Sequence, residues 1–377
     1  MTDQPASLDG PTQDSPGSSG QPSVWLMLSD KLGDNAQVDA VVDQLGIPVE
    51  RKFLSVLPKY AKKRPVFEAT LSHLDLSKSS PLEPPWPDFV FTIGRRPSMA
   101  ALWVRRQSNN STRIILIGRP RRFLQDFELV VCSVLYRVPE SPNVMQIALP
   151  LMRKDEAEVA EAAEAWRGRF ASLARPLTAV LVGGPTKPFK MDQGVAARLM
   201  EQVAELQEKD GGTAIVTTSR RTPEAVVRDI ERRLPPGAQF YPWRKENTEN
   251  PYLGLLGLAD RFIVTADSVS MMVEVARLGN PLAIFPLPKQ QKLKERLSSF
   301  LLRVLRGETG ASPRPRPSKL VAGAVGYSRY FDALYQVLLD RGLAVKLGDE
   351  FPKSGARPAD ELAEVVARVR EVLAKPR

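Results

Sequence analysis

The chain of 377 residues contains one cysteine, Cys132, and one histidine, His73. A single cysteine excludes an internal disulfide framework and a multi-cysteine zinc site. A single histidine argues against Ser-His-Asp catalysis and against a multi-histidine metal centre. We expect Cys132 to be buried and inert, because it follows an apolar strand, and His73 to be a solvated helix residue. Neither side chain has a role in the chemistry described below.

Long apolar runs are also missing. No segment approaches the roughly 20 apolar residues that a membrane-spanning helix needs. The first residues lack the basic and apolar regions of a signal peptide. Residues 1–23 are rich in Ser, Pro, Gly, Gln and Asp, so we expect a disordered tail there. These features predict a cytoplasmic protein whose ordered part begins at residue 24.

Basic residues are in excess over acidic ones. The formal net charge is +10, and residues 1–23 contain three aspartates and no Lys or Arg, which leaves +13 for the rest of the chain. Such a charge indicates an anionic partner: a nucleoside diphosphate, an anionic membrane surface or a nucleic acid. A solvated basic surface is the simpler alternative. Nucleic acid is the least supported partner, because no reading module and little aromatic interleaving accompany the arginines that suggest it, namely Arg105, Arg106, Arg113, Arg119, Arg121 and Arg122.

From residue 24 onward, short apolar segments alternate with helical patterns. Segments such as VWLMLS (24–29) and RIILIG (113–118) lack period-two alternation, which is typical of parallel strands covered on both faces. Two such series predict two doubly wound, Rossmann-like α/β domains that face each other across a cleft. The predicted units are a tail (1–23), a first domain (24–150), a linker helix (151–175), a second domain (176–350) and a C-terminal helix that returns toward the first domain (351–377).

Candidate chemistry lies where predicted strands end, since ligands of such folds bind there. After the first strand, Asp34 or Asp30 can act as a general base facing an acceptor hydroxyl. Helix capping is the structural alternative for Asp34. At the start of the second series, Gly183 and Gly184 let backbone amides approach a phosphate or sugar, or simply serve turn geometry.

A third segment contains Ser219, Arg220 and Arg221 directly before a predicted helix. Arginines at a helix start oppose the helix dipole, so their placement favours the binding of an anion such as a diphosphate. Trp243 and Asn250 follow in the next loop. Trp243 can hold a base by stacking, although loop aromatic residues often only pack against their neighbours.

The fourth segment contains Asp267, Ser268, Ser270 and Glu274. Asp267 and Ser268 can cap the helix that follows a strand. Glu274, one turn into that helix, can complement the dipole or accept hydrogen bonds from two ribose hydroxyls. We therefore group these residues with the third segment as a candidate nucleotide site.

Taken together, several segments resemble the mitochondrial-fission (elongated-mitochondria) family: SDKLGDNAQ (29–37), TTSRRTP (217–223), ENPYLGLLGLAD (249–260) and VTADSVSMMVEVARLGNP (264–281). This family looks like a branch of the GT-B glycosyltransferases. More distantly, it is similar to the enzymes that make lipid II and the lipid A disaccharide, in which a Glu on the helix after a late strand binds the ribose. Glu274 matches that position by motif.

The resemblance implies a GT-B-like fold with an acceptor-side domain at 24–150 and a nucleotide-sugar-binding domain at 176–350. It also implies an inverting glycosyltransferase that uses a nucleoside-diphosphate sugar to build a cell-envelope glycoconjugate. No D-x-D sequence occurs in the chain. We therefore expect no metal and no cofactor, with arginines and a helix N-terminus neutralising the diphosphate.

The resemblance also implies an alternative, because plant members are associated with recruiting the fission machinery to mitochondria. In that role the chain would be a non-catalytic adaptor or membrane-surface protein. Residues 289–306 form a basic amphipathic pattern that can lie on an anionic bilayer or pack onto the domain. A lipid-linked acceptor would join both roles. The family usually carries a Pro and a His-Asp pair where this chain has residues 132–136, which implies an altered acceptor side or a lost activity.

Overall fold

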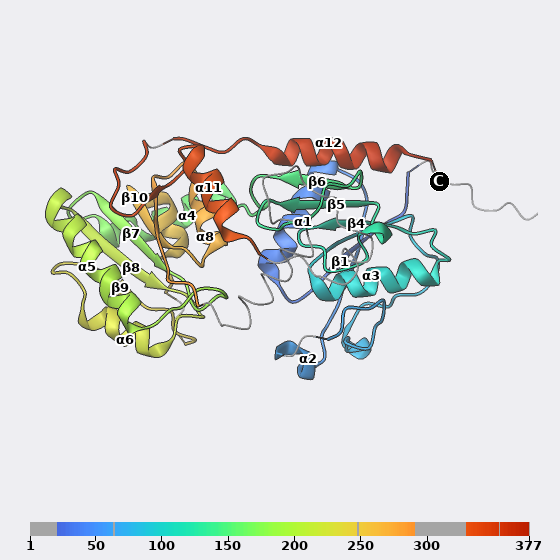
Figure 1. Cartoon of the computed structure of the whole chain (residues 1–377), viewed down its shortest axis with the longest axis horizontal. Helices are drawn as coiled ribbons and strands as arrows, with labels where there is room; N and C mark the ends of the chain where they lie inside the picture. Colours follow the sequence, from blue (N-terminus) through green and yellow to red (C-terminus); the bar gives the residue numbers. More distant parts are fainter. Residues whose placement is uncertain (1–20, 63–64, 247–248, 291–328, 354, 377) are drawn as a thin grey trace, which may run out of the picture.

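The computed structural model describes residues 21–62, 65–246, 249–290, 329–353 and 355–376. It contains two six-stranded sheets with helices packed around them, which lie side by side along the long axis of the molecule (Figure 1). Two doubly wound α/β domains, the GT-B-like class predicted from the sequence, are therefore confirmed. The expected tail up to residue 20 and most of the basic amphipathic segment 289–306 lie outside the described residues.

The first sheet has the strand order β2-β1-β3-β4-β5-β6, with every neighbouring pair parallel. Strand β1 is buried along its whole length because both faces are covered. Leu26 belongs to the core on one face, and Trp25 and Met27 belong to the core on the other. The elements are β1 (Val24–Leu28), α1 (Leu32–Leu45), β2 (Glu50–Phe53), α2 (Pro58–Lys62), η1 (Leu76–Lys78), β3 (Phe89–Ile93), α3 (Arg95–Gln107), β4 (Arg113–Ile117), η2 (Leu124–Asp126), β5 (Leu129–Ser133) and β6 (Val144–Ile147).

The second sheet has the order β12-β11-β10-β7-β8-β9 and is also parallel throughout. The chain builds outward from β7 through β9 and then returns to place β10 on the other side of β7. The topological switch point, where doubly wound folds bind ligands, therefore lies between β7 and β10. The elements are α4 (Glu156–Phe170), β7 (Leu177–Val182), α5 (Gln193–Asp210), β8 (Thr213–Thr218), α6 (Glu224–Arg232), β9 (Gln239–Tyr241), α7 (Tyr252–Leu258), β10 (Arg261–Thr265), α8 (Val269–Arg277), β11 (Leu282–Phe285), α11 (Phe331–Asp340), β12 (Val345–Lys346) and α12 (Glu361–Ala374).

Helix α4, which falls within the predicted linker segment, packs against α7 of the second domain. A Cβ atom added to Gly254 would lie 2.7 Å from the Trp166 ring, and one added to Gly257 would lie 2.8 Å from the Cβ of Ala163. These two glycines of the LGLLGL segment therefore allow the helices to approach closely. Val159 and Phe170 of α4 belong to the core of the second domain.

The chain passes between the domains twice, outward in the segment between β6 and α4 (the outgoing crossing) and back in the segment between β12 and α12. The two connecting regions contact each other. Helix α12 packs its apolar face on the first domain beside α1 (Figure 1). The buried Glu361 carboxylate at its start accepts hydrogen bonds from the amides of Ala148 at 2.5 Å and Leu149 at 3.1 Å. Arg277 of α8 donates to the carbonyl of Pro150 at 3.0 Å. The outgoing crossing is thus held by both the returning helix and the second domain.

The two rare residues lie inside the first domain. Cys132 is buried as expected, and burial raises the pKa of its thiol to about 12. The expectation for His73 is wrong: it is fully buried in an irregular segment, not solvated on a helix. Its Nε2 lies 3.0 Å from the carbonyl oxygen of Arg96, and burial is the main cause that lowers its pKa. Within the described ranges, no helix has the length and apolarity needed to cross a membrane.

We predict that Glu361→Ala lowers the free energy of unfolding by about 1–3 kcal/mol, because two buried amides lose their acceptor. Glu364 provides a matched control, since it lies in the same first turn of α12 but is exposed. Glu364→Ala should change stability by less than about 0.5 kcal/mol. Urea unfolding of both variants checks this. Equal effects of the two substitutions would contradict a structural role for the Glu361 hydrogen bonds.

Candidate functional site

The carboxyl ends of β7 and β10 meet at the switch point of the second sheet, and Asp267 connects them. Its side chain is buried, with 3% of the residue exposed. One carboxylate oxygen accepts from the amide of Gly184 at 2.8 Å, and the other accepts from the hydroxyl of Thr265 at 2.8 Å. The Thr265 hydroxyl in turn accepts from the amide of Gly183 at 2.8 Å. The structure thus brings Gly183, Gly184 and Asp267 together.

Of the two roles considered for the glycine pair, the contacts in the structure favour turn geometry. Both amides are already donated within the protein, so they are not directed at a phosphate or sugar. A Cβ atom on Gly183 would lie 2.3 Å from both Asp267 and Ser268, and one on Gly184 would lie 2.4 Å from the carbonyl oxygen of Arg221. The glycines are needed because three loops pack directly on the backbone at this point.

The loop after β8 brings the predicted arginines to the same place. Arg221 lies 3.8 Å from a carboxylate oxygen of Asp267 and also donates to the hydroxyl of Thr186. Its side chain is 51% exposed, so the guanidinium has one buried partner and one face toward solvent. Ser219 is half-buried and holds the loop through its amide, which donates to Val182 at 2.9 Å. Arg220 is exposed and has no hydrogen bond or ion pair with the described residues.

Burial of the Asp267 carboxylate raises its pKa, and burial is the largest contribution. The Gly184 amide, the Thr265 hydroxyl and the Arg221 charge act in the opposite direction. Two of these partners belong to loops far from Asp267 in the sequence. The ionised Asp267 carboxylate is stabilised by these partners, and Arg221 is one of them. The ion pair therefore helps to fix the position of Arg221.

Glu274 lies in the second turn of α8 and pairs with Tyr252 at the start of α7. The Tyr252 hydroxyl donates to Glu274 Oε2 at 2.5 Å. Burial is the main cause that raises the pKa of Glu274, opposed by the Tyr252 hydroxyl and the charge of Lys154. Asn250 is exposed, and its side-chain oxygen accepts from the Tyr252 amide at 3.0 Å. Asn250 thus also holds the start of α7, in addition to its predicted role in nucleotide-sugar binding.

The remaining predicted residues of this domain are less closely connected. Ser268 is buried, and its hydroxyl has no hydrogen-bond partner in the described part of the chain. Ser270 is exposed at the start of α8. Trp243 is 40% exposed after β9, and its amide donates to the hydroxyl of Thr218 at 2.9 Å. Trp243 and Glu274 share no hydrogen bond or ring contact in the described part of the chain, and stacking of a base on the Trp243 ring stays a prediction.

In the first domain, Asp34 lies at the corresponding switch point. Strand β1 is flanked by β2 and β3, and a Cβ atom on Gly94, which follows β3, would lie 3.5 Å from Asp34 Oδ2. The capping alternative is wrong, because the residue before α1 is Lys31 and Asp34 lies in the first turn. Lys31 and Asp34 are 3.9 Å apart. Asp30 is exposed in the same loop.

Three residues of the site were missed from the sequence: Thr265, Tyr252 as the partner of Glu274, and Tyr335. The Tyr335 hydroxyl, on α11, donates to the carbonyl of Ala266. Tyr252 stands in the ENPY segment and could have been found there. Tyr335 carries no local signal, because its contact spans 69 residues. Across the described ranges, no three His, Cys, Asp or Glu side chains gather as metal ligands would.

Comparison with known proteins shows that the part of the chain that carries these loops matches a known family. Residues 33–306 match the family described as Mitochondrial fission ELM1. Mitochondrial fission protein ELM1 of Arabidopsis thaliana is 28% identical over 220 residues, which cover 52% of this chain and 51% of the plant protein. The match thus spans about half the length of that relative. The uncharacterized protein RP120 of Rickettsia prowazekii is 24% identical over 313 residues, covering 73% of this chain and 86% of that protein.

Solved structures of low sequence identity also align over most of the chain. A glycosyltransferase from Rickettsia africae covers 95% of this chain and 100% of its own, at 10% identity and a TM-score of 0.46. A UDP-GlcNAc 2-epimerase from Neisseria meningitidis covers 93% and 99%, at 11% identity and a TM-score of 0.46. The family match extends through the loops after β7, β8 and β10 and beyond Glu274. This chain belongs to the Mitochondrial fission ELM1 family.

Proposed function

We propose that this protein binds a nucleoside-diphosphate sugar at the carboxyl edge of the second sheet and transfers the sugar, with inversion, to an acceptor hydroxyl. One observation carries the proposal. At the switch point between β7 and β10, the half-exposed Arg221 guanidinium is held by the buried Asp267 carboxylate. Such a cation, placed where doubly wound folds bind their ligands, is well suited to a diphosphate.

The proposed diphosphate site consists of Arg221, the exposed Arg220 and the N-terminus of α6, which begins three residues after Arg221. A helix N-terminus and guanidinium groups both stabilise the negative charge that grows on a leaving diphosphate. These groups supply the required charge from the protein itself. We therefore propose a transfer that needs neither a metal nor another cofactor.

The proposed ribose site is Glu274. Its Oε2 atom accepts the Tyr252 hydroxyl, while Oε1 has no hydrogen bond to any described residue. Tyr252 thus fixes the orientation of the carboxylate and leaves one oxygen for a ribose hydroxyl. The exposed Ser270, at the start of the same helix, extends this polar surface, and the buried Ser268 hydroxyl lies behind it at the residue before the helix. The exposed ring of Trp243 is the proposed platform for the base.

Asp34 is the proposed general base, with Asp30 as the competing candidate in the same loop. The carboxylate takes the proton from the acceptor hydroxyl as that oxygen forms a bond to the anomeric carbon. The bond between the anomeric carbon and the diphosphate oxygen breaks, and its electron pair leaves with the nucleoside diphosphate. A single displacement of this kind inverts the configuration at the anomeric carbon.

The acceptor is proposed to be part of a cell-envelope glycoconjugate, carried on a lipid. The excess of basic residues fits work at an anionic membrane surface on the cytoplasmic side. A protein bound peripherally at that surface would reach a lipid-linked acceptor without any membrane-spanning helix.

An adaptor that keeps the fold without catalysis is the second candidate. The observation that favours it lies at the end of β5, where the resemblance to the family implies a His-Asp pair. Here the Cys132 thiol is buried with a pKa raised to about 12, and the Ser133 hydroxyl is buried without a partner among the described residues. Neither can act as a base near neutral pH, so the acceptor side depends on the β1–α1 loop.

We predict that one nucleotide family among UDP, GDP, ADP, CDP and dTDP raises the melting temperature of the purified protein, since it binds only the folded state. Arg221→Gln and Glu274→Gln should each weaken that nucleotide at least tenfold, about 1.4 kcal/mol, in calorimetric titrations. Arg198→Gln, an exposed change on α5, is the matched control. Unchanged affinity in both site variants would contradict the proposed donor site.

A second prediction concerns pH. Glu274 has an ordinary pKa of 4.5 that is raised in the folded protein, so the unfolded chain releases this proton first. Between 4.5 and the raised value, ionisation lowers the stability of the wild type by up to about 1.4 kcal/mol per pH unit relative to Glu274→Gln. The variant should therefore gain relative stability as pH rises through this window. Parallel denaturation curves from pH 4 upward that keep a constant difference would refute this.

Asp34→Asn separates catalysis from binding. We expect wild-type affinity for the nucleotide but a loss of sugar transfer of about 10²-fold or more, because the acceptor hydroxyl loses its base. Release of nucleoside diphosphate from a nucleotide sugar measures the transfer. Asp43→Asn, an exposed change on the same helix, should have no effect. Nucleotide binding without turnover in the wild type, tested with lipid-linked acceptors, would favour the adaptor instead.

A further inference from the structure

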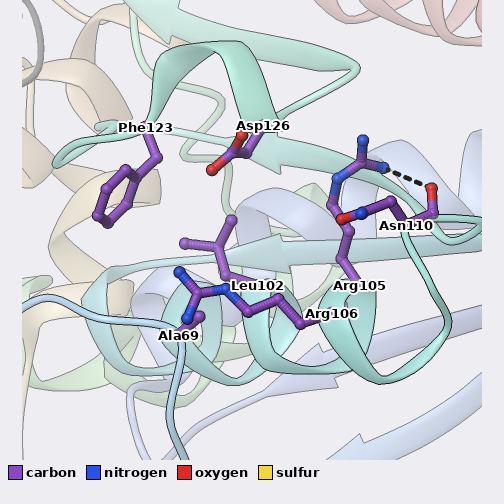
Figure 2. Close-up of a pocket in the computed structure, with 7 residues that line it drawn as sticks. All are labelled: Ala69, Leu102, Arg105, Arg106, Asn110, Phe123 and Asp126. Atoms are coloured by element: carbon purple, nitrogen blue, oxygen red, sulfur yellow. Dashed lines mark hydrogen bonds between the residues drawn. The ribbon is translucent and has the colours of Figure 1, made fainter.

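A pocket lies in the first domain, between the last turn of α3 and the short helix η2 (Figure 2). Its volume is about 150 Å³. Helix α3 starts at the carboxyl edge of the sheet, after β3, and runs back across it, so the pocket lies away from the Asp34 loop. It is lined by apolar, cationic and anionic side chains together: Ala69, Leu102, Arg105, Arg106, Asn110, Phe123 and Asp126.

The charged groups of this pocket are not paired with one another. Arg105 donates to the carbonyl oxygens of Asn110 at 3.2 Å and Thr112 at 2.7 Å, so its guanidinium is fixed in place without a carboxylate partner. Arg106 is exposed, and Asp126 is half-buried. In the described part of the chain, neither side chain has a hydrogen bond or an ion pair. Figure 2 shows the Asp126 carboxylate and the Arg106 guanidinium on opposite sides of the space over Leu102.

The aromatic wall of the pocket is held in a costly conformation. Phe123 has a φ of 57°, in the left-handed region that a bulky residue rarely adopts. Its ring stacks on Phe67 with centroids 6.1 Å apart, and the Arg122 guanidinium lies 5.2 Å from the ring centre. Backbone strain of this kind persists where surrounding contacts enforce it, and it is concentrated at binding sites. These contacts hold the ring in the wall of the pocket that Asp126 also lines.

We propose that this pocket binds a small zwitterion. Its anionic group would pair with Arg106, assisted by the fixed charge of Arg105, and its ammonium group would pair with Asp126. Leu102 and Ala69 provide the apolar floor between the two charged ends. A cavity of about 150 Å³ holds a benzene-sized group. This size fits a free α-amino acid or the phosphoethanolamine unit of a lipid headgroup, which share the same pair of charges.

Calorimetric titration of the full chain distinguishes these sources and tests the site. The probes are alanine and phosphoethanolamine, compared with inorganic phosphate as the anion alone and ethanolamine as the cation alone. We expect at least one zwitterion to bind with a Kd near or below about 1 mM, at least tenfold tighter than either single-charge probe. Tighter binding of alanine indicates an amino acid, and tighter binding of phosphoethanolamine indicates a headgroup.

Arg106→Gln and Asp126→Asn should each weaken the zwitterion at least tenfold, while the melting temperature stays unchanged because neither side chain supports the fold. Two exposed residues of α5 provide matched controls, Arg198→Gln and Glu201→Gln, which should bind as the wild type does. Glu274→Gln should also leave this binding intact, so failure at one site is distinguishable from failure at the other. Absence of binding by both zwitterions at about 10 mM, equal binding of phosphate, or full affinity in both pocket variants would overturn the proposal.

Discussion

The buried carboxylate of Asp267 is the interaction on which the second domain's loops depend. It accepts hydrogen bonds from the Gly184 amide after β7 and from the Thr265 hydroxyl at the end of β10, and it forms an ion pair with Arg221 after β8. A carboxylate removed from water is unfavourable unless its oxygens are satisfied, and the raised pKa of Asp267 reflects that cost. The three loops are therefore held together because each supplies part of what this one group requires.

This arrangement also connects the candidate donor site to the junction between the domains. Helix α8 starts directly after Asp267 and Ser268, carries Glu274 in its second turn, and ends at Arg277. The Arg277 guanidinium reaches the carbonyl of Pro150 in the outgoing crossing. One rigid helix of nine residues thus extends from the switch point to the chain that joins the two domains. A displacement of α8 cannot leave the crossing unaffected.

The fold could be predicted from the sequence because each strand is recognisable from the apolar pattern of its own residues. Strand β1 is apolar throughout and β7 is apolar except for Thr178, a pattern typical of a sheet covered on both faces. The positions of Arg221, in the loop after β8, and of Glu274, on the helix after β10, followed from the same pattern. The sequence left two roles open for the glycine pair, because its partner Asp267 lies 83 residues further along the chain. His73 was misplaced for a similar reason: its burial depends on packing against α3, and no periodic pattern around it records that contact.

Two buried carboxylates differ in a way that separates structure from function. Glu361 accepts two backbone amides that would otherwise be unpaired, so the fold itself accounts for its presence. Among the described residues, Glu274 accepts one hydrogen bond, from the Tyr252 hydroxyl, and burial raises the pKa of its carboxyl group, so the folded state disfavours its charge. A glutamine at position 274 would keep an oxygen for Tyr252 without that cost. The hydrogen bond to Tyr252 therefore does not require an acid at this position, whereas the proposed ribose hydroxyl, which needs a strong acceptor, would.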